Sequence, residues 1–195
     1  MATSQREVIQ FLQNRNWKYE SDRASNTVIT GIRTTYIQHL LIFIRIKENG
    51  EYIQFLAPQL CHLKNNVFKG VAYQTLLHIS YGEPLIRFAT DPTDGEICAS
   101  IELPLEDVNL TQKLFDRCLD ELIHIIDMET MPRLNSVLST GHDKGKVNPI
   151  EYLYKATMGD RYSINYDFRG NAEALLIRAT TEDLEWLAGQ VQQRR

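Results

Sequence analysis

The sequence predicts an α+β fold: an antiparallel sheet packed against helices in the order α-β-β-β-α-β-β-α, with a small α/β C-terminal extension. Two observations predict this class. Apolar runs rich in Ile, Leu and Phe are separated by short turn sequences, which is typical of strands joined as hairpins. The helical segments stand between groups of strands, without the regular alternation of strand and helix that a parallel sheet requires.

The expected strands lie at residues 27–34, 36–47, 52–57, 85–91 and 96–103, after extended structure that begins at Trp17. The two central strands flank Asn49-Gly50, the residues preferred in a two-residue hairpin turn, so we expect them to pair antiparallel. Pro58 is expected to end the second of these strands. The last strand alternates apolar and polar residues, which is typical of a strand with one face in water.

The expected helices lie at residues 6–14, 66–81, 111–127 and 132–138. Ser4 is the candidate N-cap of the first helix. Gly82 is expected to end the second helix in a left-handed conformation. The third helix carries the broadest apolar face and is expected to pack on the sheet. Together these elements form a predicted domain at residues 1–140.

The rest of the chain is divided into a predicted linker at residues 141–150 and an extension at residues 151–195, which is expected to dock on the body or on a second copy. The segment from Gly141 to Lys146 resembles a phosphate-binding loop. However, it lacks one spacer residue and has Val147 in place of the hydroxyl residue that would bind a metal. We therefore interpret this segment as a solvated linker.

Charge and hydropathy exclude two classes of partner. The 195 residues include 21 Lys and Arg against 25 Asp and Glu, a formal charge of −4, whereas a nucleic-acid-binding protein needs a basic face. The longest apolar-rich stretch, Ile37 to Ile46, is too short to cross a bilayer as a helix. The first residues show no apolar core of a secretion signal, so we expect a cytoplasmic protein that binds neither nucleic acid nor membrane.

The residues that commonly carry chemistry form no recognisable catalytic, cofactor or metal motif. The three cysteines have no C-x-x-C spacing. Cys61 adjoins His62 in an expected loop, but neighbouring side chains usually point apart. Asp116 and Asp120 lie one helical turn apart and could share a cation, although we interpret them as part of a solvent-exposed helix face. We therefore expect no enzyme, no cofactor and no metal.

The central hairpin is apolar on both faces, which indicates that something covers the second face. The helix at residues 66–81 also carries apolar side chains at four-residue intervals beyond its core stripe. The candidate residues of a partner or dimer interface are Leu41, Phe43, Ile53, Phe55, Tyr73, Leu77 and Tyr81. Three covers remain open: a second copy, the C-terminal extension and a client protein.

Several local sequences, taken with the element order, resemble the YbjN-like family, whose fold is similar to that of type III secretion chaperones. These are Trp17-Lys18-Tyr19 after a short helix, the Ile/Phe-rich hairpin, the helix at residues 66–81, and the long helix that begins at Leu110-Thr111 and ends near Met131-Pro132. The resemblance covers about residues 5–140. It implies a compact unit that commonly dimerises and holds or regulates other proteins, with no catalytic residues to transfer.

The sequence therefore predicts a non-enzymatic protein-binding module, chaperone-like or regulatory, which acts through apolar sheet and helix surfaces as a homodimer. Its expected partner is a protein client. The alternative is a regulatory protein that senses a small ligand or a nucleotide through Gly141 to Lys146.

Overall fold

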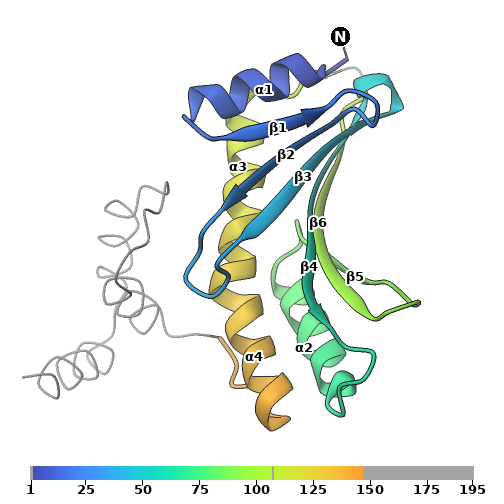
Figure 1. The fold of residues 1–195 in the computed structure, drawn as a ribbon, viewed down its shortest axis with the longest axis vertical. Helices are drawn as coiled ribbons and strands as arrows, with labels where there is room; N and C mark the ends of the chain where they lie inside the picture. The colour runs from blue at the N-terminus through green and yellow to red at the C-terminus, as the bar shows by residue number, and fades with distance from the viewer. Residues whose placement is uncertain (1, 107, 147–195) are drawn as a thin grey trace, which may run out of the picture.

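The computed structural model describes residues 2–106 and 108–146 and confirms the α+β class (Figure 1). The six strands form one antiparallel sheet in the order β1-β2-β3-β4-β6-β5. Their bounds are β1 Tyr19–Asp22, β2 Thr27–Ile32, β3 Leu40–Lys47, β4 Tyr52–His62, β5 Arg87–Thr90 and β6 Glu96–Pro104. The sheet has one strand more than the sequence predicts. The additional strand, β1, forms where extended structure without a partner strand was expected.

The helices cover one face of this sheet. Their bounds are α1 Gln5–Asn14, α2 Lys69–Gly82, α3 Gln112–His124, η2 Ile125–Thr130 and α4 Met131–Thr140. A short helical turn, η1 Glu48–Gly50, lies apart from them in the loop between β3 and β4. The core lies between this face and the helices, and the ring of Phe115 on α3 lies 5.4 Å from that of Phe55 and 5.3 Å from that of Phe11. No helix in the described part of the chain is long and apolar enough to cross a membrane.

The predicted start of α1 is confirmed by its cap. The Ser4 hydroxyl accepts the backbone N–H of Glu7, and the Glu7 carboxylate accepts the backbone N–H of Ser4 at 2.7 Å. This reciprocal pair satisfies two N–H groups that the first helical turn leaves without partners. The Ser4 hydroxyl also donates to the Glu7 carboxylate at 2.7 Å, and this bond, followed by that from the Ser4 N–H, lowers the pKa of Glu7.

The hairpin between β3 and β4 lies at Asn49-Gly50 as predicted, but its loop has four residues instead of two. Lys47 pairs with Tyr52, and three successive loop residues adopt positive φ. Gly50 is required there because its φ is +98° and a Cβ atom would collide with the backbone of Thr3.

Two predicted element ends are wrong. Strand β4 does not stop at Pro58 but continues to His62, because a bulge between Ala57 and Cys61 takes the proline out of the ladder. Gly82 is the last helical residue of α2 and has no positive φ; the cap falls on Glu83 instead.

The long helix and the shorter piece expected after it form one continuous rod. A π-helical segment, η2, joins α3 to α4, and Pro132 lies in the first turn of α4. Proline is tolerated at that position. Within η2 the hydroxyl of Thr130 donates a hydrogen bond to the carbonyl of Ile125 at 3.0 Å, which supports the wide turn.

Candidate functional site

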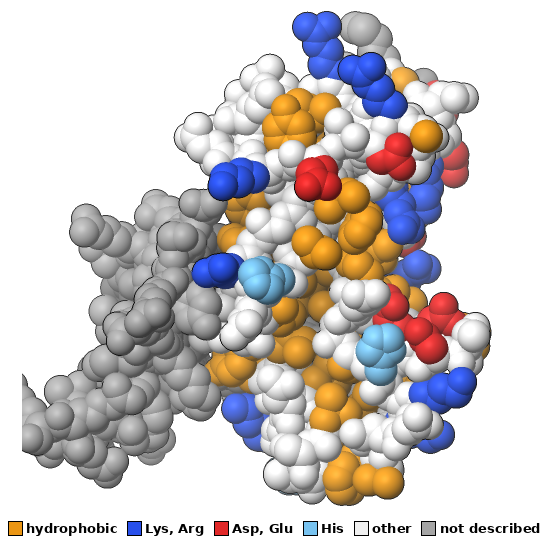
Figure 2. Space-filling model, viewed as in Figure 1, with side chains coloured by type: hydrophobic (Ala, Val, Ile, Leu, Met, Phe, Trp, Pro, Cys, Tyr) orange, Lys and Arg blue, Asp and Glu red, His pale blue; other side chains and the backbone are white. Residues whose placement is uncertain are grey.

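One side of the sheet is covered by none of the described helices and is termed the helix-free side. It has an apolar patch, visible in Figure 2 as hydrophobic side chains along the middle of the view. Cross-strand pairing aligns Ile29, Phe43 and Leu56 in one row, and Leu41 lies beside Phe43 on the same face, two residues away along β3. Leu41 is 48% exposed, and the other three are half-buried. These four residues are termed the open apolar face.

Two predicted interface residues, Ile53 and Phe55, do not lie on this face. Both are fully buried in the core beneath the helices. The register gives the reason: Phe55 pairs with Ile44, and directly opposed residues of an antiparallel pair point to the same side of the sheet. The prediction that they belong to an exposed interface is wrong, and Leu56 takes their place.

The three predicted residues of α2 lie on a separate surface. Leu77 is 70% exposed and Tyr81 is 95% exposed, whereas Tyr73 is half-buried against the core. Helix α2 packs on the helix-covered side of the sheet. The structure therefore divides the predicted interface into an open apolar face on the sheet, an exposed helix surface and two core residues.

Strands β3 and β4 separate at one end of the sheet (Figure 1). Their ladder ends at the Phe43–Leu56 pair, so residues 40–42 of β3 pair only with β2, and residues 57–60 of β4 lie beyond the last pair with β3. The bulge at Pro58 lies in this separated part. The opening between residues 40–42 and 57–60 is termed the β3–β4 notch.

A cavity of about 300 Å³ lies in the notch. Residues 36–41 line one wall, residues 58–60 line the other, and Met131 of α4 contributes a third side. Leu41 belongs both to this cavity and to the open apolar face. The two features therefore form one continuous surface.

The loop before β3 is held in place by a buried carboxylate. Asp127 of η2, only 2% exposed, accepts the backbone N–H groups of Thr35 at 3.1 Å and Tyr36 at 2.8 Å. These two hydrogen bonds join adjacent residues of the loop to one side chain of the helical rod. The cavity therefore has a fixed wall where it meets this loop.

A cluster of polar side chains lies on the same helix-free face beside the apolar patch. The Glu102 carboxylate accepts hydrogen bonds from Tyr52 at 2.5 Å, Gln54 at 2.9 Å and Arg87 at 2.8 Å. The bond from Tyr52 is the largest cause that lowers the pKa of Glu102, and the same bond raises the pKa of Tyr52. Arg87 neutralises the charge of Glu102. The cluster therefore forms a polar border of the open apolar face and adds no unpaired carboxylate to it.

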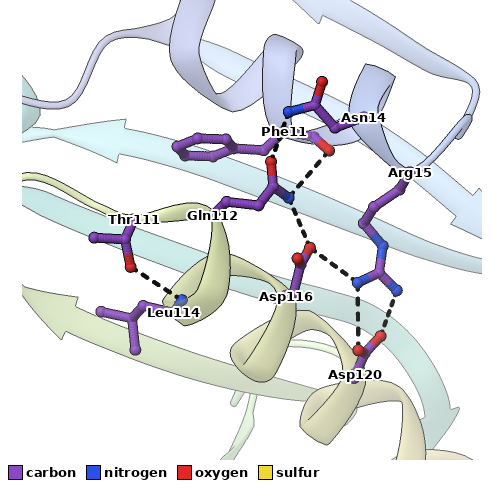
Figure 3. A network of polar contacts seen from close by, with 8 residues as sticks. All are labelled: Phe11, Asn14, Arg15, Thr111, Gln112, Leu114, Asp116 and Asp120. Carbon is purple, nitrogen blue, oxygen red and sulfur yellow. Dashed lines mark hydrogen bonds and ion pairs between the residues drawn. The ribbon is translucent and has the colours of Figure 1, made fainter.

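The two aspartates considered for a shared cation bind an arginine instead (Figure 3). The Arg15 guanidinium, at the end of α1, donates to Asp116 at 2.9 Å and to Asp120 at 2.5 Å, and its charge takes the place of a metal ion. Gln112 extends the network by donating to Asp116 and to the carbonyl of Phe11. The network fastens α1 to α3. In residues 2–106 and 108–146, no three His, Cys, Asp or Glu side chains gather as a metal site.

The first residues of the predicted linker lie against the helices. Asp143 accepts two hydrogen bonds from the Arg133 guanidinium, at 2.9 and 2.6 Å, and one from the hydroxyl of Thr75 at 3.1 Å. The Arg133 bonds are the main reason that the pKa of Asp143 falls to about 2. Lys146 pairs with Glu129 at 2.8 Å, so carboxylates surround the segment that resembles a phosphate-binding loop.

The neighbouring Cys61 and His62 lie in β4, not in the expected loop. Successive strand residues point to opposite faces, so the pair does not act together. Burial raises the pKa of the Cys61 thiol to about 11. The thiol is therefore uncharged at neutral pH, and the thiolate needed for nucleophilic attack is absent.

The solved structure of YbjN from E. coli, described as a candidate transcription regulator, has the same fold as this chain. The alignment covers 69% of this chain and 94% of YbjN, with a TM-score of 0.53 and 12% sequence identity. The chain has a YbjN-like fold. No protein-family model matches the sequence, and no curated protein matches it. At this level of identity, the likeness to YbjN is one of architecture.

Sequence reasoning missed both the notch and the glutamate cluster. The signal for the notch was Pro58 inside an apolar run, which marks a bulge as readily as a strand end. The signal for the cluster was the position of Glu102 on β6, but its partners come from β4 and β5 and depend on the strand order.

Proposed function

We propose that the protein is a non-enzymatic binding module, chaperone-like or regulatory, that holds a client protein on the open apolar face. One observation carries the proposal: Leu41, Phe43, Leu56 and Ile29 remain half-buried or exposed on a sheet face that none of the helices in residues 2–106 and 108–146 covers. Contiguous exposed apolar surface on a globular protein commonly marks an interaction site. The description of YbjN as a candidate transcription regulator supports the regulatory form of this proposal.

Three of the described groups that could support catalysis are held by ion pairs or burial. Arg15 is bound by two aspartates, Asp143 by Arg133, and the Cys61 thiol has a raised pKa. The structural roles of these three groups support a binding role for the protein over an enzymatic one.

We also propose that the protein forms a homodimer through α2, where Leu77 and Tyr81 are exposed one helical turn apart. The second copy would bury these side chains, which otherwise contact water. Light scattering after size-exclusion chromatography is expected to give twice the mass of the chain, and Leu77→Glu combined with Tyr81→Glu is expected to halve it. An unchanged mass for the double variant would contradict a dimer at this surface.

The alternative, a sensor of nucleotides or phosphate compounds, depends on residues 141–146. The carboxylates of Glu129 and Glu83 pair with Lys146 there, and they would repel a phosphate group. Thermal shift with nucleotides is expected to show no stabilisation of the protein. A reproducible shift that Lys146→Met removes would favour the sensor instead.

A cytoplasmic location fits the proposal, because the three cysteines Cys61, Cys98 and Cys118 are all free thiols.

Site-specific photo-crosslinking in cells tests the binding function. The full chain carries p-benzoylphenylalanine in place of Leu41 or, as a matched control, in place of Val108, which is 65% exposed on the loop before α3. We expect a discrete crosslinked client at position 41 and none at position 108. The same products at both positions, or none at position 41, would contradict binding at the open apolar face.

A further inference from the structure

We propose that the π-helical segment η2 couples residues 141–146 to the loop before β3, so that loosening the contacts of one loosens those of the other. Residues 141–146 are termed the strap, and the loop comprises residues 33–39, between β2 and β3. The loop forms a wall of the cavity that continues into the open apolar face. The strap would therefore regulate that face, and this regulatory role rests on the proposed binding function.

The strap begins at the end of α4 and lies back along the helices. Asp143 accepts two hydrogen bonds from Arg133 of α4, and the Lys146 ammonium lies 2.8 Å from the Glu129 carboxylate of η2. The side chains of Arg133 and Glu129 are only 8% and 15% exposed. Loss of the strap would take an ion-pair partner from each of these two charges, and a charge left unpaired away from water is costly.

The loop is held by the buried carboxylate of Asp127, which also belongs to η2. This carboxylate accepts the N–H groups of Thr35 and Tyr36. Met131, four residues farther along the rod, lines the cavity. The loop and the cavity therefore meet the rod at positions 127 and 131.

The two sets of contacts alternate along the rod. Positions 127 and 131 meet the loop and the cavity, whereas positions 129 and 133 meet the strap. Side chains four residues apart share a helix face, and those two residues apart lie on nearly opposite faces. The loop and the strap thus hold the same stretch of the rod from two sides. A displacement that loosens one set of contacts also moves the groups of the other.

The segment η2 is the part of this stretch that can change its shape. A π-helical turn is rare and is often found at functional sites. Here the wide turn is supported by the fully buried hydroxyl of Thr130, which donates to the carbonyl of Ile125 at 3.0 Å. The contacts of Asp127 and Glu129 lie within the same turn, so the loop and the strap both favour this form over a regular α-helical turn. An element whose two forms are biased by two sites provides coupling between those sites.

The first test is hydrogen–deuterium exchange of the full chain, with the amides of Thr35 and Tyr36 as reporters of the loop. The amide of Gly145, which donates to the Asp143 carboxylate at 2.9 Å, reports the strap. Thr130→Val keeps the shape of the side chain and removes the hydroxyl that supports the wide turn. We expect all three amides to exchange about fivefold faster in this variant. Acceleration on one side only, or on neither, would overturn the coupling.

Destabilisation of the whole fold has a different signature. The N–H of Leu105 donates to the carbonyl of Glu51 at 2.7 Å, at the end of β4 away from the notch. We expect this amide to exchange in the Thr130→Val variant as it does in the wild type. Acceleration of Leu105 by the same factor would assign the effect to general destabilisation and refute the coupling.

The second test loosens the strap without changing a residue of the loop. Lys146→Met removes the ion pair with Glu129, and we expect the two loop amides to exchange about fivefold faster. Arg87→Met is the matched control. The Arg87 side chain is 64% exposed and lies 2.8 Å from Glu102, whereas that of Lys146 is 67% exposed and lies 2.8 Å from Glu129. Equal exchange of the loop amides in the two variants would refute transmission from the strap.

Coupling between two sites acts in both directions. Asp127→Asn weakens the hold on the loop, and we expect the amide of Gly145 in the strap to exchange faster by a similar factor. An unchanged Gly145 amide in this variant would contradict the coupling. These measurements use the chain alone. A crosslinked client at position 41 without coupling would therefore refute this inference alone, and coupling without a crosslink would refute the proposed binding function and its regulation.

Discussion

The two faces of the sheet both carry large apolar side chains near its centre, but the described helices cover only one of them. Phe55 and Phe43 lie on adjacent strands, one register row apart, yet Phe55 is fully buried against Phe115, and Phe43 is half-buried on the helix-free side. Both faces are apolar near the centre of the sheet. The comparison teaches that an apolar strand predicts a buried surface without indicating whether the chain's own helices or a partner buries it.

The largest loss of stability is expected when a side chain on the helix-covered face of the sheet is shortened. Phe55→Ala should lower the free energy of unfolding by about 3–5 kcal/mol, because the change leaves a cavity between β4 and α3. The matched control Phe43→Ala removes the same atoms from the open side and should cost less than half as much. Urea unfolding measures both. Equal losses would mean that the helix-free face is covered in the isolated protein.

The next largest loss of stability is expected at the ion pair between Arg133 of α4 and Asp143. Asp143→Asn weakens the contact with Arg133, whose side chain is 8% exposed. The pKa of Asp143 is lowered from 3.8 to about 2, so the folded state binds this proton less tightly than the unfolded state. The stability it contributes, about 2 kcal/mol, is complete above about pH 4 and is lost as the pH falls toward 2.

Urea unfolding at several pH values checks this prediction. We expect the Asp143→Asn variant to be less stable than the wild type at pH 7, and the two stability curves to converge between pH 4 and pH 2. A difference that is independent of pH would contradict the assignment to this carboxylate.

A smaller effect is expected at the contact between α1 and α3. Arg15→Met removes the hydrogen bonds to Asp116 and Asp120 and should cost about 1.5 kcal/mol, the lower end of the usual range for hydrogen bonds to charged groups, because both carboxylates are partly exposed. Arg6→Met is the matched control, because Arg6 is exposed on the same helix. Faster amide exchange in α1 should accompany the loss in the Arg15 variant. Equal amide exchange of α1 in both variants would contradict the conclusion that Arg15 holds α1 against α3.

The smallest effect is expected at the open apolar face. Leu41→Ser should change the free energy of unfolding by less than about 0.5 kcal/mol, because the side chain is 48% exposed. Crosslinking of a client from an adjacent position should nevertheless fall sharply. A loss of stability as large as that of Phe43→Ala would show that Leu41 packs against something in the free protein.

Much of the fold follows from local sequence signals. Ser4 caps the first helix, Asn49-Gly50 turns the central hairpin, and the apolar spacing of residues 112–124 places α3 on the sheet. Each of these signals depends on residues near one another in the chain. The fold class could therefore be predicted before the pairing of distant elements was known.

The candidate site depends on distant pairs, and for that reason it was predicted only in part. The interface prediction placed Leu41 and Phe43 correctly outside the core, but Phe55 lies in it because its face is set by pairing with Ile44. The notch requires β3 and β4 to separate, which results from the bulge at Pro58 and from the tether of the preceding loop to Asp127. Pro58 marks the bulge within its own segment, but the tether to Asp127 joins residues 91 and 92 positions apart and has no local signature.

The π-helical segment at residues 125–130 lets one continuous helical rod present different side chains to different partners before and after it. Before it, α3 turns Phe115 toward the sheet, and after it, α4 turns Arg133 toward Asp143 and Thr75. Deleting one residue from the wide turn would rotate everything downstream by about 100°, one step of an α-helix. Arg133 and Asp143 would rotate together, away from Thr75 on α2, so a one-residue change of phase would break the contact between α2 and the segment that follows η2.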